Sequence, residues 1–229
     1  MNNSLIIFDC DGVLVDSEPL AARVLAEAVS KLGIAMDSEE AEKVFLGCSM
    51  EMVVEIVEVR LGRPVEADFT ARFLDRLHVE MGRDLAAIAG VGEAIEKIQA
   101  LENIAGLCVA SNGEAETVAI SLEAVGLAQF FSRHLFTARA AGRAKPHPDL
   151  FLHAAGEMDF APANCIVVED SLHGVNGAVA AGMRVFGYAP SADPDGLRDH
   201  TLSVAGAKMF TNMDQLPGLI AGELRRQYK

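Results

Sequence analysis

The sequence predicts an α/β fold: a doubly wound parallel sheet that carries an inserted, all-helical segment. Five short apolar runs, each bounded by Gly, Asn, Asp or Pro, have the pattern of fully buried strands: 5–8, 106–110, 135–137, 165–168 and 184–188. Stretches with helical spacing follow most of these runs. Strands that alternate with helices form parallel sheets with helices on both faces.

Three of the helical stretches carry their own start or stop signals. Residues 116–125 are followed by Gly126, and residues 173–181 are followed by Gly182. A glycine is common just past the end of a helix. The third stretch, 148–158, opens on Pro and Asp, which are typical of a first helical turn.

One segment breaks the alternation of strands and helices. Between residues 17 and 87 no strand pattern is convincing, and four helical patterns fit instead: 19–32, 38–45, 50–61 and 66–81. We therefore expect two domains, an α/β core formed by residues 1–16 and 88–229 and a helical domain formed by residues 17–87.

Composition and charge limit the classes of function. The chain has 229 residues and a formal net charge of −14, so it should bind neither nucleic acid nor an anionic membrane. The apolar run near residue 5 is too short for a signal peptide, and no run reaches transmembrane length. The four widely spaced cysteines suggest buried, reduced thiols. We expect a cytoplasmic protein whose partner is a small molecule; its oligomeric state stays open.

Polar side chains follow three of the predicted strands at the point where each strand ends. These residues are Asp9 and Asp11, Ser111 and Asn112, and Glu169 and Asp170. In open parallel sheets, ligands bind beyond the carboxyl ends of the strands. Lys145 lies in a loop just before a predicted helix and can reach the same edge. The sequence therefore predicts one site there.

This set of side chains suits phosphoryl transfer. Crowded carboxylates repel one another unless a cation is bound, and oxygen-only ligands favour a hard cation such as Mg²⁺. A lysine, a hydroxyl group and loop N–H groups can hold the remaining phosphate oxygens. One carboxylate can then act as a nucleophile and another as a general acid.

Each pattern also has an ordinary structural interpretation. Two acids after a strand could form a solvated loop or a calcium site, although a calcium loop needs a third ligand before its glycine, and Gly12 follows Asp11 directly. The Glu-Asp-Ser stretch at 169–171 could cap the next helix. The Ser-Asn-Gly stretch at 111–113 could be a simple turn, and Lys145 could be a surface lysine.

Four stretches in this order resemble the motifs of the haloacid dehalogenase (HAD) superfamily: DCDGVLVDS, ASNG, KPHPDLF and VVEDSLHGV. The resemblance extends over essentially the whole chain and includes the helical insert, which that family uses as a cap. It implies a Rossmann-like core. Within the superfamily the chain is similar to the β-phosphoglucomutase-like branch of sugar-phosphate phosphatases, and most of all to the 6-phosphogluconate phosphatase type.

The resemblance implies a role for each matching acid. Asp9 would attack phosphorus and become an aspartyl phosphate. Asp11 would protonate the leaving alkoxide and then activate water. Asp9, the backbone carbonyl of Asp11 and Asp170 would hold Mg²⁺. Glu169 would either bind the metal directly or lie just behind its ligands.

The resemblance also implies how phosphate and substrate are bound. Ser111 and Lys145 would bind the transferring phosphoryl group with help from Asn112, while Cys10 would contribute its backbone N–H and Gly12 a sharp turn. In the cap, the candidate substrate contacts are Glu18, Gly47 and Ser49, and cations that could meet an anionic group are Arg23, Lys43, Arg72 and Arg76.

Two other functions are weighed against a phosphatase. A sugar phosphomutase of this branch would carry an arginine in the cap loop and a histidine after the nucleophile, but Met50 and Ala21 stand at these positions. A receiver-like signalling module, or another non-catalytic phosphate-binding module, is the alternative from a different class. Receiver domains place their phosphoacceptor after the third strand and lack a helical insert, whereas Asp9 follows the first strand.

Overall fold

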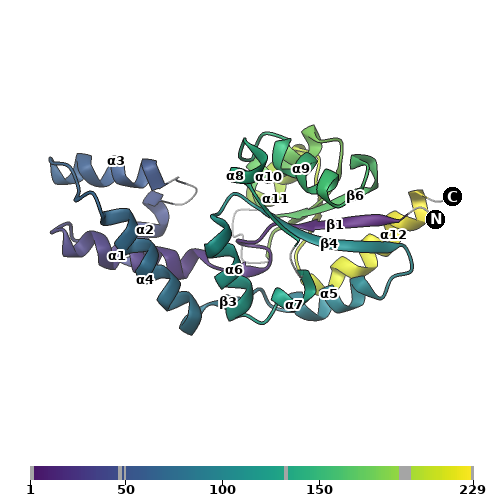
Figure 1. The fold of residues 1–229 in the computed structure, drawn as a ribbon, viewed down its shortest axis with the longest axis horizontal. Coiled ribbons are helices and arrows are strands. Elements are labelled where there is room, and N and C mark those ends of the chain that lie inside the picture. The colour runs from purple at the N-terminus through teal and green to yellow at the C-terminus, as the bar shows by residue number, and fades with distance from the viewer. Residues whose placement is uncertain (1–2, 46–47, 49, 132–133, 191–196, 228–229) are drawn as a thin grey trace. The chain divides into compact units, whose positions relative to one another are not determined.

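The computed structural model describes residues 3–45, 48, 50–131, 134–190 and 197–227 (Figure 1). The chain divides into two compact units. Met1–Val15 and Ala87–Lys229 form one unit, here called the sheet unit. Asp16–Ala86 form the other, here called the helical unit.

A six-stranded parallel sheet lies at the centre of the sheet unit, in the order β5-β4-β1-β6-β7-β8. The strands are β1 (Ser4–Phe8), β4 (Ile104–Ser111), β5 (Leu135–Thr137), β6 (Cys165–Glu169), β7 (Arg184–Tyr188) and β8 (Lys208–Phe210). The order reverses at β1, because later strands are added first on its β4 side and then on its β6 side. This confirms the predicted α/β class, and in such sheets ligands bind beyond the end of the strand at which the order reverses, here β1.

Helices cover both faces of this sheet (Figure 1). They are α5 (Val91–Gln99), α6 (Ala115–Ala124), α7 (Ala128–Phe131), α8 (Ala138–Ala141), α9 (Asp149–Glu157), α10 (Leu172–Ala180), α11 (Leu197–Val204) and α12 (Leu216–Gln227), with short 3₁₀ turns η1 (Pro162–Asn164) and η2 (Met213–Gln215). The three predicted helices of this unit match α6, α9 and α10: α6 and α10 begin and end one residue earlier than predicted, and α9 is one residue shorter at each end. Gly126 and Gly182 follow α6 and α10 with φ of 72° and 75°, as helix-ending glycines do.

The alternation of side chains along β1 determines which residues face the two layers of helices. Ile7 and Val167 belong to the core that includes residues of α9 and α10. Phe8 points to the opposite face and packs edge-on against Phe131 of α7, with ring centroids 5.8 Å apart. Because the side-chain period of a strand is two, the residue after Phe8 points again toward α9 and α10.

The helical unit contains α1 (Glu18–Lys31), α2 (Ser38–Phe45), α3 (Met50–Leu61) and α4 (Phe69–Asp84). Each corresponds to a predicted helix, but the range expected for the last one, 66–81, is displaced. Gly82 lies inside α4, with no positive φ, and the helix continues to Asp84. Glycine often ends a helix, but Gly82 continues this one.

Two short strands at the ends of the helical unit were not predicted. β2 (Val15–Asp16) and β3 (Ala86–Ala87) pair in a two-stranded sheet. Strands of two residues are too short to show an alternating pattern in the sequence. Among the described helices, none is long and apolar enough to cross a membrane.

Candidate active site

The residue that follows β1, Asp9, is held in the sheet by its backbone and is almost fully buried. Its N–H donates to the carbonyl of Val168 at 2.9 Å, which continues the pairing between β1 and β6. Phe8 pairs with Val168, so Asp9 lies level with Glu169. By the alternation described above, both carboxylates point toward the α9 and α10 side of the sheet.

A tight turn follows Asp9 and depends on Gly12. The carbonyl of Cys10 accepts hydrogen bonds from the N–H groups of residues 13, 14 and 15 at 3.4, 2.8 and 3.1 Å. Gly12 has a φ of 76°, which side chains disfavour, and a Cβ added there would lie 2.1 Å from Oδ2 of Asp170. Only a glycine therefore allows the turn to approach the Asp170 carboxylate.

Lys145 lies between two carboxylates. Its Nζ is 2.6 Å from Oδ1 of Asp9 and 2.7 Å from Oε1 of Glu169, and its side chain is 3% exposed. The ammonium also lies 5.1 Å from the ring centroid of Phe151 in α9. Burial alone would lower the pKa of Lys145, but Asp9 and Glu169 raise it above its ordinary value. The lysine is therefore a permanent buried cation.

The loop that carries Lys145 is attached to the end of β4 by Asn112. Oδ1 of Asn112 accepts from the backbone N–H of Lys145 at 2.9 Å, and its Nδ2 donates to the Lys145 carbonyl at 3.4 Å. Ser111 is buried, and its hydroxyl accepts from the N–H of Gly113 at 3.0 Å. These contacts bring the ends of β1, β4 and β6 together around Lys145.

Glu169 is fully buried and surrounded by donors. Its Oε2 accepts from the N–H of Asp170 at 3.0 Å and from both the N–H and the hydroxyl of Ser171 at 2.9 Å. The same Ser171 hydroxyl accepts from the N–H of Gly174 at 3.0 Å and thereby caps α10. Within the stretch 169–171, Ser171 therefore caps the next helix, as the structural interpretation expected, whereas Glu169 contacts Lys145.

Asp9, Glu169 and Asp170 form a buried group of carboxylates. One oxygen from each lies within 4.8 Å of the others, and no other such group of His, Cys, Asp or Glu occurs among the described residues. Burial raises the pKa of Asp9 well above its ordinary range; Lys145 opposes this, and the neighbouring acids add to it. One lysine leaves the group net negative, so the donor set fits a hard divalent cation such as Mg²⁺.

Asp11 and Cys10 are neighbours of this group in the chain but are not part of it: Asp11 is exposed, and Cys10 carries a thiol. Asp11 is exposed, and its Oδ2 would lie 3.9 Å from a Cβ built on Gly113, which places the carboxylate beside the end of β4. The Cys10 thiol is buried, and burial together with Asp11 and Asp9 raises its pKa. A raised pKa favours the protonated thiol, which is a weaker nucleophile than the thiolate.

The candidate cations of the helical unit lie beside acidic side chains of the same unit. Gly47 and Ser49 lie outside the described residues. Arg23 pairs with Asp84 at 2.8 Å, Lys43 with Glu39 at 2.6 Å, Arg76 with Glu80 at 2.6 Å, and Arg72 with Glu66 and Asp68. Each of the four cations thus has acidic partners within the helical unit.

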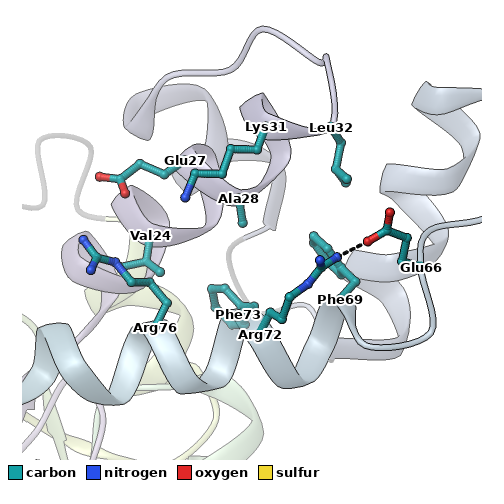
Figure 2. A pocket seen from close by; sticks show the side chains of 10 residues that line it. All are labelled: Val24, Glu27, Ala28, Lys31, Leu32, Glu66, Phe69, Arg72, Phe73 and Arg76. Carbon is teal, nitrogen blue, oxygen red and sulfur yellow. Dashed lines mark hydrogen bonds and ion pairs between the residues drawn. The ribbon is translucent and has the colours of Figure 1, made fainter.

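The helical unit has a pocket of its own, of about 320 Å³, which sequence reasoning did not identify (Figure 2). Its lining residues are Val24, Glu27, Ala28, Lys31, Leu32, Glu66, Phe69, Arg72, Phe73 and Arg76. They come from α1 and the residue that follows it, from α4 and from the segment before α4. Figure 2 shows Arg72 turned toward Glu66 at one side of this pocket.

The parallel sheet carries a buried carboxylate–lysine cluster at its strand ends, where enzymes with doubly wound α/β folds bind their ligands. A model of the haloacid dehalogenase-like hydrolase family matches residues 4–182, and the chain belongs to this family. Among curated relatives, 6-phosphogluconate phosphatase of Escherichia coli is 34% identical, and the match covers 93% of this chain and 93% of the relative. Hexitol phosphatase B of Escherichia coli is 31% identical, with 82% of this chain and 85% of the relative covered.

Solved structures agree with this assignment. A haloacid dehalogenase-like protein of unknown function from Agrobacterium tumefaciens is 36% identical with a TM-score of 0.78, covering 97% of this chain and 99% of that one. A HAD family hydrolase from Deinococcus radiodurans, with bound phosphate and sodium, is 28% identical with a TM-score of 0.78 and 96% of both chains covered. Together the comparisons confirm the predicted enzyme class, a phosphatase.

Proposed function

We propose that this phosphatase depends on Mg²⁺ and hydrolyses a small phosphorylated metabolite, a sugar or sugar-acid phosphate, through an aspartyl-phosphate intermediate. One observation carries the proposal. Lys145 lies 2.6 and 2.7 Å from the carboxylates of Asp9 and Glu169, which end neighbouring parallel strands beside Asp170. This arrangement offers a nucleophile, a fixed cation and a metal site in one place.

Asp9, Asp170 and the backbone carbonyl of Asp11 would hold the metal. The ion, when bound, offsets the negative charge of the carboxylates and of the phosphate oxygens. Gly12 supports this role, because its lack of a side chain lets the turn approach Asp170.

The chain's own groups then carry two steps. In the first, a carboxylate oxygen of Asp9 attacks phosphorus, the bond from phosphorus to the ester oxygen breaks, and Asp11 gives its proton to the leaving alkoxide. In the second, Asp11 takes a proton from water, the water oxygen attacks phosphorus, and inorganic phosphate leaves while the Asp9 carboxylate is restored. The exposure of Asp11 suits a group that exchanges protons with water.

Lys145 and Ser111 would stabilise the phosphoryl group during both steps. Lys145 is charged and buried, so its electrostatic effect on the phosphoryl oxygens is little screened by water. Asn112 fixes the backbone of the same lysine, and its contribution is to hold the loop in place.

The inserted helical segment, residues 17–87, would act as the cap that sets the choice of substrate, with Gly47 and Ser49 as the candidate substrate contacts. The curated relative named 6-phosphogluconate phosphatase supports a sugar-acid phosphate as the preferred substrate. Hexitol phosphatase B supports the wider class of sugar phosphates.

The test is a panel of phosphorylated sugars, sugar acids and small alcohols, with released phosphate as the readout. We expect release that stops with EDTA, returns with added Mg²⁺ and is absent from Asp9→Asn. We also expect 6-phosphogluconate to have the highest kcat/KM. A flat or inverted ranking would overturn the substrate choice, and EDTA-resistant release would overturn the metal dependence. Undiminished release by Asp9→Asn would overturn the mechanism.

A further inference from the structure

The Glu169 carboxylate is fixed on all sides by the chain itself. Its Oε2 accepts three hydrogen bonds of 2.9–3.0 Å, one from the N–H of Asp170 and two from Ser171. Its Oε1 accepts from Nζ of Lys145 at 2.7 Å. The side chain is 0% exposed, so water does not compete for these contacts.

Gly174 supplies the space in which this carboxylate lies. A Cβ built on Gly174 would lie 1.7 Å from Oε1, 1.8 Å from Cδ and 2.3 Å from Oε2 of Glu169. Glycine is unfavourable inside a helix, yet Gly174 lies within the first turn of α10. By contrast, nothing lies within 4 Å of a Cβ built on Gly156 in α9 or on Gly222 in α12.

A fixed Glu169 has a chemical consequence for Lys145. At rest Lys145 pairs with both Asp9 and Glu169. Once Asp9 carries the phosphoryl group, the oxygen bonded to phosphorus is no longer an anionic partner for the ammonium. Lysine has a long and flexible stem, so a second anchor is needed to keep its charge on the phosphoryl oxygens.

We propose that Ser171 and Gly174 are positioning residues for Lys145: they hold the Glu169 carboxylate against its ammonium, so that Glu169 serves the phosphate-binding lysine and not the divalent ion. The inference rests on the proposed function, since it takes Lys145 as the group that binds the phosphoryl oxygens. Asp170, which contacts the Gly12 turn, remains the metal-binding member of the pair.

The first test compares the affinities of two probes for Ser171→Ala, namely Mg²⁺ alone and inorganic phosphate in saturating Mg²⁺, both by calorimetry. We expect the Kd of phosphate to rise about tenfold or more, the size expected for a lost hydrogen bond to a charged group. The Kd of Mg²⁺ should change less than about threefold. Ser171→Thr, which keeps the hydroxyl, should restore phosphate affinity. Equal losses for both probes, or an unchanged phosphate Kd, would overturn the proposal.

Two controls separate positioning from simple loss of structure. Asn212 caps η2 through Asp214 N–H at 2.9 Å, so Asn212→Ala removes a cap without touching Glu169. Asp170→Asn is the reference for lost Mg²⁺ binding. We expect Asn212→Ala to bind both Mg²⁺ and phosphate as the parent does. We expect Asp170→Asn to lose Mg²⁺ affinity, whereas Ser171→Ala keeps it.

A second, independent test uses a matched pair of glycine substitutions. Gly174→Ala displaces the Glu169 carboxylate and should weaken phosphate binding and lower kcat/KM by at least about tenfold. Gly222→Ala adds the same methyl group to a helix where nothing obstructs it and should leave both unchanged. Equal behaviour of the two variants would contradict the proposal. If Gly174→Ala does not fold, the phosphate and Mg²⁺ affinities of Ser171→Ala and Ser171→Thr test the proposal.

The two hypotheses fail in different ways. A wild-type protein without Mg²⁺-dependent phosphate release would refute the proposed function. A wild-type protein with that activity, whose Ser171→Ala variant binds phosphate as tightly as the parent, would refute only the positioning role.

Discussion

Lys145 is the residue on which the charge balance of the site depends. It is the buried cation that contacts the carboxylates of Asp9 and Glu169, at 2.6 and 2.7 Å. Removing one partner of a buried ion pair is costly, because the charge left behind is neither solvated nor compensated. Both the stability of the site and its chemistry should therefore respond to this one side chain.

Lys145→Met removes the charge and nearly keeps the length of the side chain. We expect the free energy of unfolding of the metal-free protein to fall by about 3–5 kcal/mol. We expect kcat/KM to fall by about 10²- to 10³-fold, because a fixed charge at the phosphoryl group is lost. Urea denaturation and steady-state kinetics measure the two effects.

A matched control is Lys97→Met, since Lys97 is an exposed lysine 3.9 Å from Glu93. Such exposed pairs contribute about 0–1 kcal/mol, so this variant should be nearly neutral. If Lys145→Met is as mild as Lys97→Met, Lys145 has neither role.

Single residues could be predicted from the sequence where they directly follow an apolar run. Asp9 and Glu169 were found in this way. The contacts of the Lys145 side chain could not be predicted from the sequence, because its partners Asp9 and Glu169 are 136 and 24 positions away in the chain. The hydrogen bond between its backbone and Asn112, 33 positions away, could not be predicted either. Such pairings depend on how strand ends meet in space.

At the scale of elements, the turn after β1 is the feature most sensitive to substitution. Gly12→Ala places a Cβ 2.1 Å from Oδ2 of Asp170 and also forces a side chain into a φ of 76°. We expect this variant to lose most of its Mg²⁺ affinity and activity, because the Asp170 carboxylate must move. Calorimetric titration with Mg²⁺ measures the loss.

Gly126→Ala is the matched control for this turn. Gly126 has a similar φ of 72°, but nothing lies within 4 Å of its added Cβ. It should cost only the backbone strain of about 1–2 kcal/mol and leave Mg²⁺ binding unchanged. A Gly12→Ala protein that binds Mg²⁺ as well as Gly126→Ala does would contradict the role given to the turn.

An apolar run bounded by turn residues could be predicted as a strand, as for β5, and elements that lack such a run could not. β8 has three residues, of which only Phe210 is buried, so it shows no buried apolar run. β2 and β3 have two residues each. The helix α12 was not predicted, although it carries a signal: its buried Leu216, Ile220 and Leu224 recur every four residues, as on one face of a helix.

For the whole molecule, the buried acids link stability to pH and to metal. The pKa of Asp9 is raised above its unfolded value, chiefly by burial. The metal-free folded state therefore binds a proton that the unfolded state has already released. Its stability falls as the pH rises from about 4, the ordinary pKa of aspartate, through the raised pKa of Asp9.

Asp9→Asn should remove this pH dependence. We expect the metal-free variant to be more stable than the parent at neutral pH and to lose that advantage toward pH 4. Added Mg²⁺ should reverse the order by stabilising the parent more than the variant. Urea denaturation across this pH range, with and without Mg²⁺, measures both effects. A parent that is the more stable of the two without metal would contradict the raised pKa.

The pairing of β2 with β3 has a consequence for how such a protein can diversify. The two points where the chain leaves and rejoins the sheet unit are neighbouring strands, and paired strands lie about 5 Å apart. A segment of any length whose ends meet at that spacing fits between them without changing the order of the six strands. With residues 17–85 in the proposed role of a substrate-selecting cap, their exchange between related chains is therefore a route to new substrate preferences on an unaltered sheet unit.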